Sequence, residues 1–113
     1  MSDDCIFCRI GRGDIRTAFV AESERLVAFR DIDPKAPLHV LVIPRAHVDS
    51  LASADDESLL GELLAMAARI ARDEGYGGSG YRVVVNTGSD GGQSVPHLHL
   101  HLLAGRHLSW PPG

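Results

Sequence analysis

The sequence lacks the features that mark membrane-spanning, secreted and nucleic-acid-binding proteins. No apolar run reaches the roughly 18 residues that span a bilayer, and the N-terminus, MSDDCIFCRI, opens with acids where a signal peptide has basic residues. The net charge of −4 provides no basic excess for neutralising a phosphate backbone. We therefore expect a cytoplasmic protein with no membrane and no nucleic-acid partner, although backbone amides would still suit a small anionic ligand.

Cysteine is also scarce, because Cys5 and Cys8 are the only two in 113 residues. A disulfide between positions three apart would close too short a loop to stabilise a fold through chain entropy. The pair is expected to hold something else or to be incidental, since two ligands alone do not make a zinc site. With 44% hydrophobic residues the chain has enough apolar content for one core, and we expect a single domain over residues 1–113.

Hydrophobic periodicity predicts an α+β fold. Short runs rich in valine, phenylalanine and alanine indicate strands, and the first two are expected to form a hairpin. After the third strand, apolar residues recur at three and four positions, as in an amphipathic helix capped by Ser53 or Asp55. The expected elements are strands at 17–23, 25–32 and 38–44, a helix at 55–74, a strand at 81–87, a flexible turn at 88–92 and a final histidine-rich strand.

The last expected strand places His97, His99 and His101 at alternate positions, with leucines between them. Successive side chains of a strand point to opposite faces, so the leucines should enter the core and the three imidazoles should share the other face. Two chemistries need such a row: metal binding and nucleophilic catalysis by a neutral imidazole. For His39 and His107, which lie outside the row, the sequence does not decide between a functional and an ordinary structural role.

The segment NTGSDGGQSV, directly before the histidines, supplies a second part of a site. Gly88, Gly91 and Gly92 let backbone N–H groups approach an anion without obstruction by a Cβ, and the side chains of Gln93 and Ser94 add donors. A glycine-rich turn beside a row of histidines predicts phosphoryl or nucleotidyl transfer, with a phosphate held next to a nucleophile.

Several separated blocks of the chain together resemble the histidine triad (HIT) family, and within it the Hint branch of purine nucleoside phosphoramidases. PHLHLHLL matches the pattern His-x-His-x-His, with NTGSDGGQSV before it and GRHLSWPPG after it. CIFCRI, AFRDIDPKAPLHVLVIPRAH and DDESLLGELL follow the same order in the rest of the chain. The resemblance implies a HIT-like fold, with a five-stranded, mostly antiparallel sheet, one long helix and a short N-terminal helix.

The resemblance also implies a two-step hydrolysis of AMP-type nucleoside phosphoramidates and acyl-adenylates. By the family mechanism, His99 attacks the α-phosphorus and forms a covalent nucleotidyl-histidine intermediate, which water cleaves to the nucleoside monophosphate. His101 is implied to hold the phosphoryl oxygens, and Ser94 to hydrogen-bond the leaving group. A backbone carbonyl that accepts from Nδ1–H of His99 would leave Nε2 free to attack.

Further residues are implied to bind the purine nucleotide. Asp31 is the candidate acceptor from the ribose hydroxyls. Trp110 lies in SWPPG, which in the Hint branch reaches toward the partner subunit's active site, and is a candidate contact with the leaving group there. The other implied residues are Ile6, Phe7, Phe29 and Ile32 around the base and Asn86, Gly92 and Gln93 around the phosphate. The four apolar residues are equally consistent with ordinary core. Family members are homodimers joined through the helix and the strand 81–87, so a homodimer is expected.

Family members with Cys-x-x-Cys hold a structural zinc, and the implied ligands here are Cys5, Cys8, His47 and His97. His97 would then be structural, while His99 and His101 would serve the chemistry. Some members lack the cysteines and fold without zinc, so two thiols without metal are the alternative, and a reducing compartment disfavours a disulfide. No organic cofactor is expected.

Other functions are consistent with the same residues. A zinc-containing nucleotide-binding or interaction module with little turnover is one, because a complete triad permits catalysis but does not show that substrate is turned over. A dinucleoside polyphosphate hydrolase is another, although its carboxy end differs from SWPPG. Metal binding by the whole histidine row would need more than one zinc per chain. The sequence leaves open the physiological leaving group and the choice between adenosine and guanosine.

Overall fold

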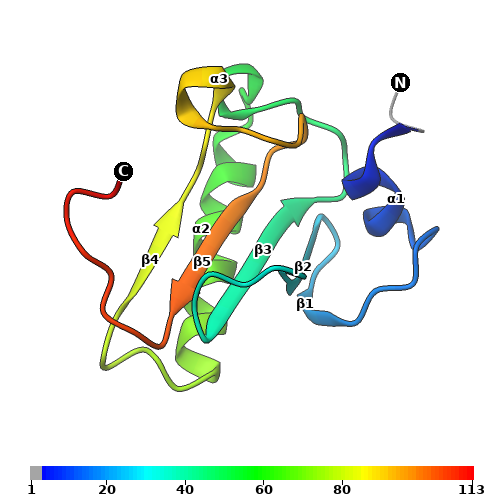
Figure 1. The fold of residues 1–113 in the computed structure, drawn as a ribbon. Helices are drawn as coiled ribbons and strands as arrows, with labels where there is room; N and C mark the ends of the chain where they lie inside the picture. Colours follow the sequence, from blue (N-terminus) through cyan, green and yellow to red (C-terminus); the bar gives the residue numbers. More distant parts are fainter. Residues whose placement is uncertain (1–3) are drawn as a thin grey trace.

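A computed structural model describes residues 4–113 and shows one antiparallel sheet of five strands, in the order β1-β2-β3-β5-β4 (Figure 1). The expected α+β fold is confirmed, with its long helix and its short N-terminal helix. No helix in the described part of the chain is long and apolar enough to cross a membrane. The elements are α1 (Ile6–Arg12), β1 (Phe19–Glu22), β2 (Leu26–Arg30), β3 (Leu38–Pro44), a 3-10 turn (Leu51–Ser53), α2 (Glu57–Asp73), β4 (Tyr81–Val84), α3 (Gly88–Gly91) and β5 (Leu100–Ala104).

Helix α2 covers one face of the sheet, behind the strands in Figure 1, and encloses the larger core. Its Leu63 and Ala67 are fully buried against the sheet, which is the inward face that the apolar periodicity predicts. The helix is capped by Asp56, whose Oδ1 accepts from Leu59 N–H at 3.0 Å, and not by Ser53 or Asp55 as expected. Ser53 instead ends the 3-10 turn before the helix.

The opposite face of the sheet has two parts. Under α1, a smaller core forms around Phe7, Phe29 and Ile43. Farther along the same face lie His39, which is next but one to Leu41 in β3, and His101, which pairs with Leu41 in β5. Because side chains alternate along strands, the two histidines share one face and their apolar neighbours enter the α2 core.

The secondary structure predicted from the sequence is wrong at three places. The turn expected at 88–92 forms the short helix α3, which ends at Gly92 with φ of 79°, a conformation that glycine adopts without strain. The strand expected at 81–87 ends at Val84. The histidine strand begins only at Leu100, because Pro96 has no N–H to donate and His97 N–H donates to Val95 O at 2.8 Å in a tight turn.

The alternation of side chains nevertheless extends through this irregular segment. Leu98 and Leu102 are 1% and 0% exposed, and both belong to the α2 core. The backbone is held here because Leu98 N–H donates to Val48 O at 2.7 Å, which joins the segment to the loop after β3. The histidines between the leucines are therefore directed away from the α2 core, as the sequence predicts.

Candidate functional site

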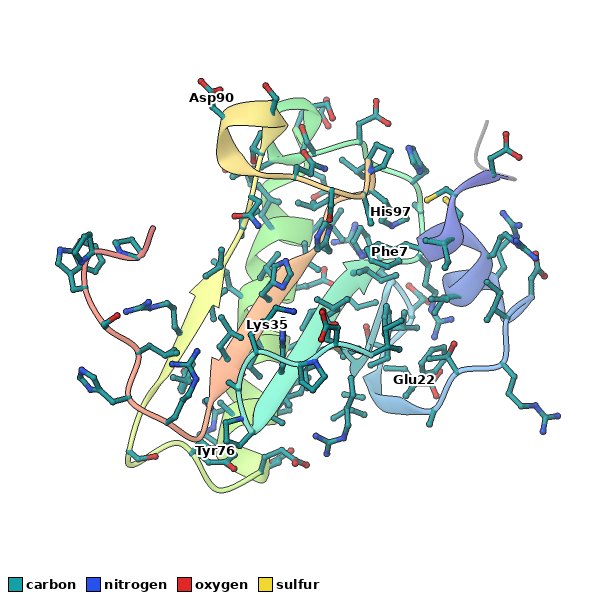
Figure 2. The ribbon with its side chains drawn as sticks, in the orientation of Figure 1. Phe7, Glu22, Lys35, Tyr76, Asp90 and His97 are labelled. Atoms are coloured by element: carbon teal, nitrogen blue, oxygen red, sulfur yellow. The ribbon has the colours of Figure 1, made fainter. Side chains whose placement is uncertain are left out.

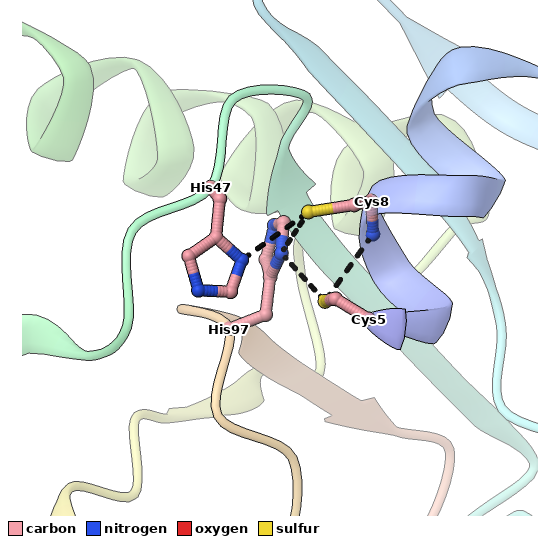
Figure 3. A group of neighbouring side chains, drawn as sticks. All are labelled: Cys5, Cys8, His47 and His97. Atoms are coloured by element: carbon pink, nitrogen blue, oxygen red, sulfur yellow. Dashed lines mark hydrogen bonds between the residues drawn. The ribbon is translucent and has the colours of Figure 1, made fainter. Parts of the chain in front are cut away.

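Four side chains from distant parts of the chain converge at the start of α1 (Figure 3). Cys5 is the N-cap of α1 and Cys8 lies in its first turn, so both sulfurs point to the same end of the helix. Nδ1 of His97 lies 3.3 Å from Cys5 Sγ and 3.5 Å from Cys8 Sγ, and Nδ1 of His47 lies 3.2 Å from Cys8 Sγ. The structure thus brings together all four residues that the sequence predicts as zinc ligands.

The donor set fits a zinc ion. Nε2–H of His47 donates to Asp49 Oδ1 at 2.7 Å, and Nε2–H of His97 donates to Pro44 O at 2.8 Å, so both Nδ1 atoms present lone pairs to the sulfurs. Burial lowers the pKa of His97, which favours the neutral form that ligation needs. Tetrahedral zinc with ordinary Zn–S and Zn–N bonds separates its sulfur and nitrogen ligands by about 3.5 Å, close to the spacing here.

His99 lies next to this cluster and has the opposite arrangement of its ring nitrogens. Its Nδ1–H donates to the backbone carbonyl of His97 at 2.8 Å, and no group within residues 4–113 hydrogen-bonds to Nε2. Nε2 therefore keeps a lone pair, as a nucleophile must. Phe7 packs edge-on against the ring at 5.2 Å between centroids, and Figure 2 shows Phe7 beside His97 at the end of α1.

A chain of hydrogen bonds sets the tautomer of His101. Lys35 N–H donates to Nδ1 of His39 at 3.0 Å, so the proton of His39 is on Nε2. That Nε2–H lies 2.9 Å from Nδ1 of His101 and 3.5 Å from Asp31 Oδ2. Because Nδ1 of His101 accepts, Nε2 of His101 carries its proton and is a donor, which suits a phosphoryl oxygen.

His39 is the member of the site to which the sequence assigned no role. It is 5% exposed and holds His101 directly. A signal was present, because His39 is the only ionisable residue in the otherwise apolar strand LHVLVIP. A histidine buried in a strand requires a hydrogen-bonding partner, and here that partner is the triad.

The ring pair formed by His39 and His101 is neutral at physiological pH. Burial, together with the neighbouring His99 and His39, lowers the pKa of His101 to about 4. Burial also lowers the pKa of His39, although Asp31 opposes that shift. Both effects arise because an imidazolium is costly where water is excluded. His101 therefore offers a neutral N–H donor, not a fixed positive charge.

The glycine loop differs from the expected cradle of unoccupied amides. Gly92 N–H donates to Ser89 O at 3.1 Å, and Gly88 N–H donates to the side-chain Oε1 of Gln93, also at 3.1 Å. Within the described residues, neither the hydroxyl nor the N–H of Ser94 has a hydrogen-bond partner, and Ser94 is exposed. The side chain of Asn86 likewise has no partner in this part of the structure. Of the side chains that the sequence assigns to the phosphate and the leaving group, Ser94 and Asn86 are thus available to a ligand.

The candidates for the base and ribose are divided between core and surface. Phe7 and Phe29 are each 6% exposed and pack edge-on at 5.7 Å, whereas Ile6 is 50% exposed and Ile32 is fully exposed. The two phenylalanines therefore belong to the hydrophobic core, and the two isoleucines remain accessible. Asp31 accepts from Asp33 N–H at 2.8 Å, so it also makes the turn after β2.

A cleft of about 590 Å³ opens beside the four-residue cluster. Ile6 and Ser94 both line it, together with Cys5 and His47. Trp110 lies elsewhere, 81% exposed on a C-terminal tail whose Leu108 and Ser109 carbonyls accept from Arg82. The structure therefore brings Ser94 and Ile6 to one hollow and leaves Trp110 apart from it.

Comparison with known proteins agrees with this geometry. A sequence model of the HIT domain matches residues 12–108, which leaves the two cysteines outside the matched range. A HIT-like protein from Synechococcus elongatus is 50% identical and one from Synechocystis is 47% identical, each over the full length of both chains. The crystal structure of a HIT family hydrolase from Legionella pneumophila has a TM-score of 0.94 at 46% identity, covering 97% of this chain and 100% of that one. A histidine triad protein from Clostridium difficile has a TM-score of 0.90 at 44% identity, with 94% of both chains covered.

Proposed function

This chain belongs to the HIT domain family, and from that premise we propose that it is a hydrolase of the Hint branch, acting on AMP-type nucleoside phosphoramidates and acyl-adenylates. The fold alone does not determine an activity, so the proposal depends on the site. The observation that carries it is the orientation of His99, whose Nδ1–H is donated to a carbonyl while Nε2 has no partner among residues 4–113. That arrangement is what a neutral imidazole nucleophile requires.

The reaction proceeds in two displacements at phosphorus. Nε2 of His99 attacks the α-phosphorus, the bond from phosphorus to the leaving nitrogen or oxygen breaks, and the leaving group takes the hydroxyl proton of Ser94, which is exposed and regains a proton from solvent. Water then attacks the nucleotidyl-histidine and loses a proton to solvent, which breaks the N–P bond and releases the nucleoside monophosphate. Nε2–H of His101 donates to a phosphoryl oxygen as negative charge accumulates on it.

Substrate binding is assigned to groups on either side of the triad. Asp31 would accept from the ribose hydroxyls, and the distance of 3.5 Å between its Oδ2 and Nε2 of His39 supports this assignment. Asn86 would donate to the nucleotide, and Gly92 allows the loop to turn toward the phosphate. The exposed Ile6 and Ile32 would contact the base over Phe7 and Phe29, and Trp110 would contact the leaving group bound in the partner subunit of a homodimer.

The assignment of zinc to Cys5, Cys8, His47 and His97 is part of the proposal. When bound, the ion would fasten α1 to the loops after β3 and before β5, and four protein ligands would leave no position for substrate. A reducing cytoplasm would keep both thiols available to the metal. A homodimer would form through α2 and the edge strand β4, where Leu64 and Tyr81 are 54% and 40% exposed.

The test is turnover of an adenosine 5′-phosphoramidate that carries a fluorescent amine. The wild-type protein should release the amine, and His99→Ala should not, while His107→Ala, which changes an exposed histidine outside the site, should match the wild type. If the wild type binds AMP but releases no amine above background, the protein is a nucleotide-binding module and the proposed hydrolase is wrong.

A further inference from the structure

The side-chain amide of Gln93 is fully occupied by the protein itself. Its Nε2 donates one hydrogen to Asp49 O at 2.8 Å and the other to Val95 O at 3.0 Å. Its Oε1 accepts from Gly88 N–H at 3.1 Å. Only one orientation of the amide satisfies all three contacts, because two partners are acceptors and one is a donor. The side chain therefore has no hydrogen left for a phosphate, contrary to the donor role expected from the sequence.

These three contacts join two loops that are 44 positions apart in the chain. On one side are Gly88, where α3 begins, and Val95, which follows Ser94. On the other side is Asp49, in the loop after β3. Gln93 thus fixes both ends of the loop that carries Ser94 and attaches that loop to a segment outside it.

Asp49 is itself part of the support of the four-residue cluster. Its backbone carbonyl accepts from Gln93, and its side-chain Oδ1 accepts from Nε2–H of His47 at 2.7 Å. Nδ1 of His47 lies 3.2 Å from Cys8 Sγ. A continuous set of contacts therefore runs from Cys8 through His47 and Asp49 to Gln93, and from there to the loop around Ser94. The hydrogen bond from Leu98 N–H to Val48 O joins the same two segments a second time.

We infer that Gln93 is a positioning residue that couples the Cys5–Cys8–His47–His97 cluster to the loop at 88–95. Binding of the metal and binding of a nucleoside monophosphate should therefore strengthen each other. Coupling between two sites is reciprocal: whatever factor the metal adds to nucleotide affinity, the nucleotide adds to metal affinity. The inference rests on the proposed function in two respects: zinc is assigned to the four-residue cluster, and the loop at 88–95 is assigned to the phosphate. It requires no turnover.

The first measurement is zinc affinity of the nucleotide-free protein, by competition with a chromophoric chelator. Gln93→Ala should weaken zinc binding about tenfold, equivalent to about 1.4 kcal/mol, because the hydrogen bond to Asp49, which supports His47, is lost together with the two that order the loop. Gln93→Met, which keeps the length of the side chain without its hydrogen bonds, should weaken it equally. Asp90→Ala is the matched control, because Asp90 lies exposed on α3 and is directed away from the cluster (Figure 2).

The second measurement repeats the zinc competition with saturating AMP. In the wild type, AMP should raise zinc affinity by about fivefold or more, and in Gln93→Ala that increase should vanish. Far-UV circular dichroism of each variant checks that the fold is retained. These readouts separate a positioning residue from a substrate contact, which would change AMP affinity and leave zinc affinity of the nucleotide-free protein as it was.

Any of three outcomes would overturn the inference. They are a zinc affinity of Gln93→Ala equal to that of the wild type, a zinc affinity of Gln93→Met equal to that of the wild type, and an increase of zinc affinity by AMP that persists in Gln93→Ala. Failure of the proposed function would look different. In that case the wild type would release no amine from the phosphoramidate, while the zinc measurements would still show the dependence on Gln93.

Discussion

The Cys5–Cys8–His47–His97 cluster and the proposed nucleophile His99 both contain imidazole rings, but the two ring nitrogens have opposite roles. At the cluster, His47 and His97 donate Nε2–H to fixed oxygens and present Nδ1 to the cysteines. Two residues farther along, His99 donates Nδ1–H and leaves Nε2 open. The spacing of the row does not produce this difference. It arises from the oxygen atom that each ring meets, because that oxygen decides which nitrogen keeps a lone pair.

The two regions also share one residue. The side chain of His97 belongs to the cluster, while its backbone carbonyl orients His99 at 2.8 Å. The region that would bind metal thus provides the acceptor that prepares the nucleophile. A substitution at His99 should therefore mainly lower turnover, and a substitution at the cluster should mainly lower zinc affinity. Each should also have a smaller effect on the other property.

The largest effect is expected on the catalytic side. His99→Ala removes the atom that attacks phosphorus, so turnover of the phosphoramidate should fall by about 10³-fold or more. Zinc content should stay at that of the wild type, because the cluster contains no atom of the His99 side chain. Single-turnover kinetics and metal analysis of the same preparation check both statements. Loss of zinc in this variant would contradict the separation of the two regions.

The largest effect on the metal side should follow from Cys8→Ser. Loss of a buried thiolate ligand should remove bound zinc and lower the free energy of unfolding by about 4 kcal/mol at a free zinc concentration 1,000 times the dissociation constant. Urea unfolding with and without a chelator measures this difference. The chelator should destabilise the wild type and leave Cys8→Ser unchanged. A chelator effect on the variant equal to that on the wild type would show that the zinc lies elsewhere.

A smaller effect is expected from His39, which supports His101 without reaching the reacting atoms. His39→Leu removes the fixed Nε2–H donor to His101, so the proton of His101 is no longer confined to the nitrogen that faces substrate. We expect kcat to fall about 10²-fold, with a smaller change in KM. Steady-state kinetics with the fluorescent phosphoramidate check this. A change confined to KM would instead make His39 a ground-state binding residue.

The smallest effect is on the pH dependence of stability. Because the pKa of His101 is about 4 in the folded protein and about 6.5 when unfolded, the unfolded state binds more protons between these values. Stability contributed by His101 is therefore complete above pH 6.5 and decreases as the pH falls toward 4. His101→Asn should show a shallower decrease in urea-unfolding free energy between pH 6.5 and 4.5. Parallel curves for variant and wild type would contradict the assignment.

Much of the fold was predictable because it depends on local patterns. The buried strand Leu38–Pro44 and the helix around Leu63 follow from their apolar periods, and the alternation of leucine and histidine correctly separates core from site. The cap of α2 was not predictable, because several neighbouring acids could fill that position. The start of β5 was not predictable either, because the turn at His97 and the hydrogen bond from Leu98 to Val48 together set it.

The candidate site was predictable as a set of residue types and less so as a set of contacts. The convergence of Cys5 and His47 is confirmed as a cluster, whereas the roles of His39 and Gln93 depend on partners far away in the chain. Gln93 resembled a substrate donor because its amide can donate, and only the structure reveals that Asp49 and Val95 already accept both hydrogens.

If the three histidines of the row serve as a ligand, a nucleophile and a donor, the covalent intermediate should form on the middle one alone. The wild-type protein would be quenched during turnover of the phosphoramidate, digested, and sequenced by mass spectrometry. We expect one nucleotidyl group per chain, attached to His99. A nucleotidyl group on His97 or His101, or turnover with no labelled histidine, would contradict it.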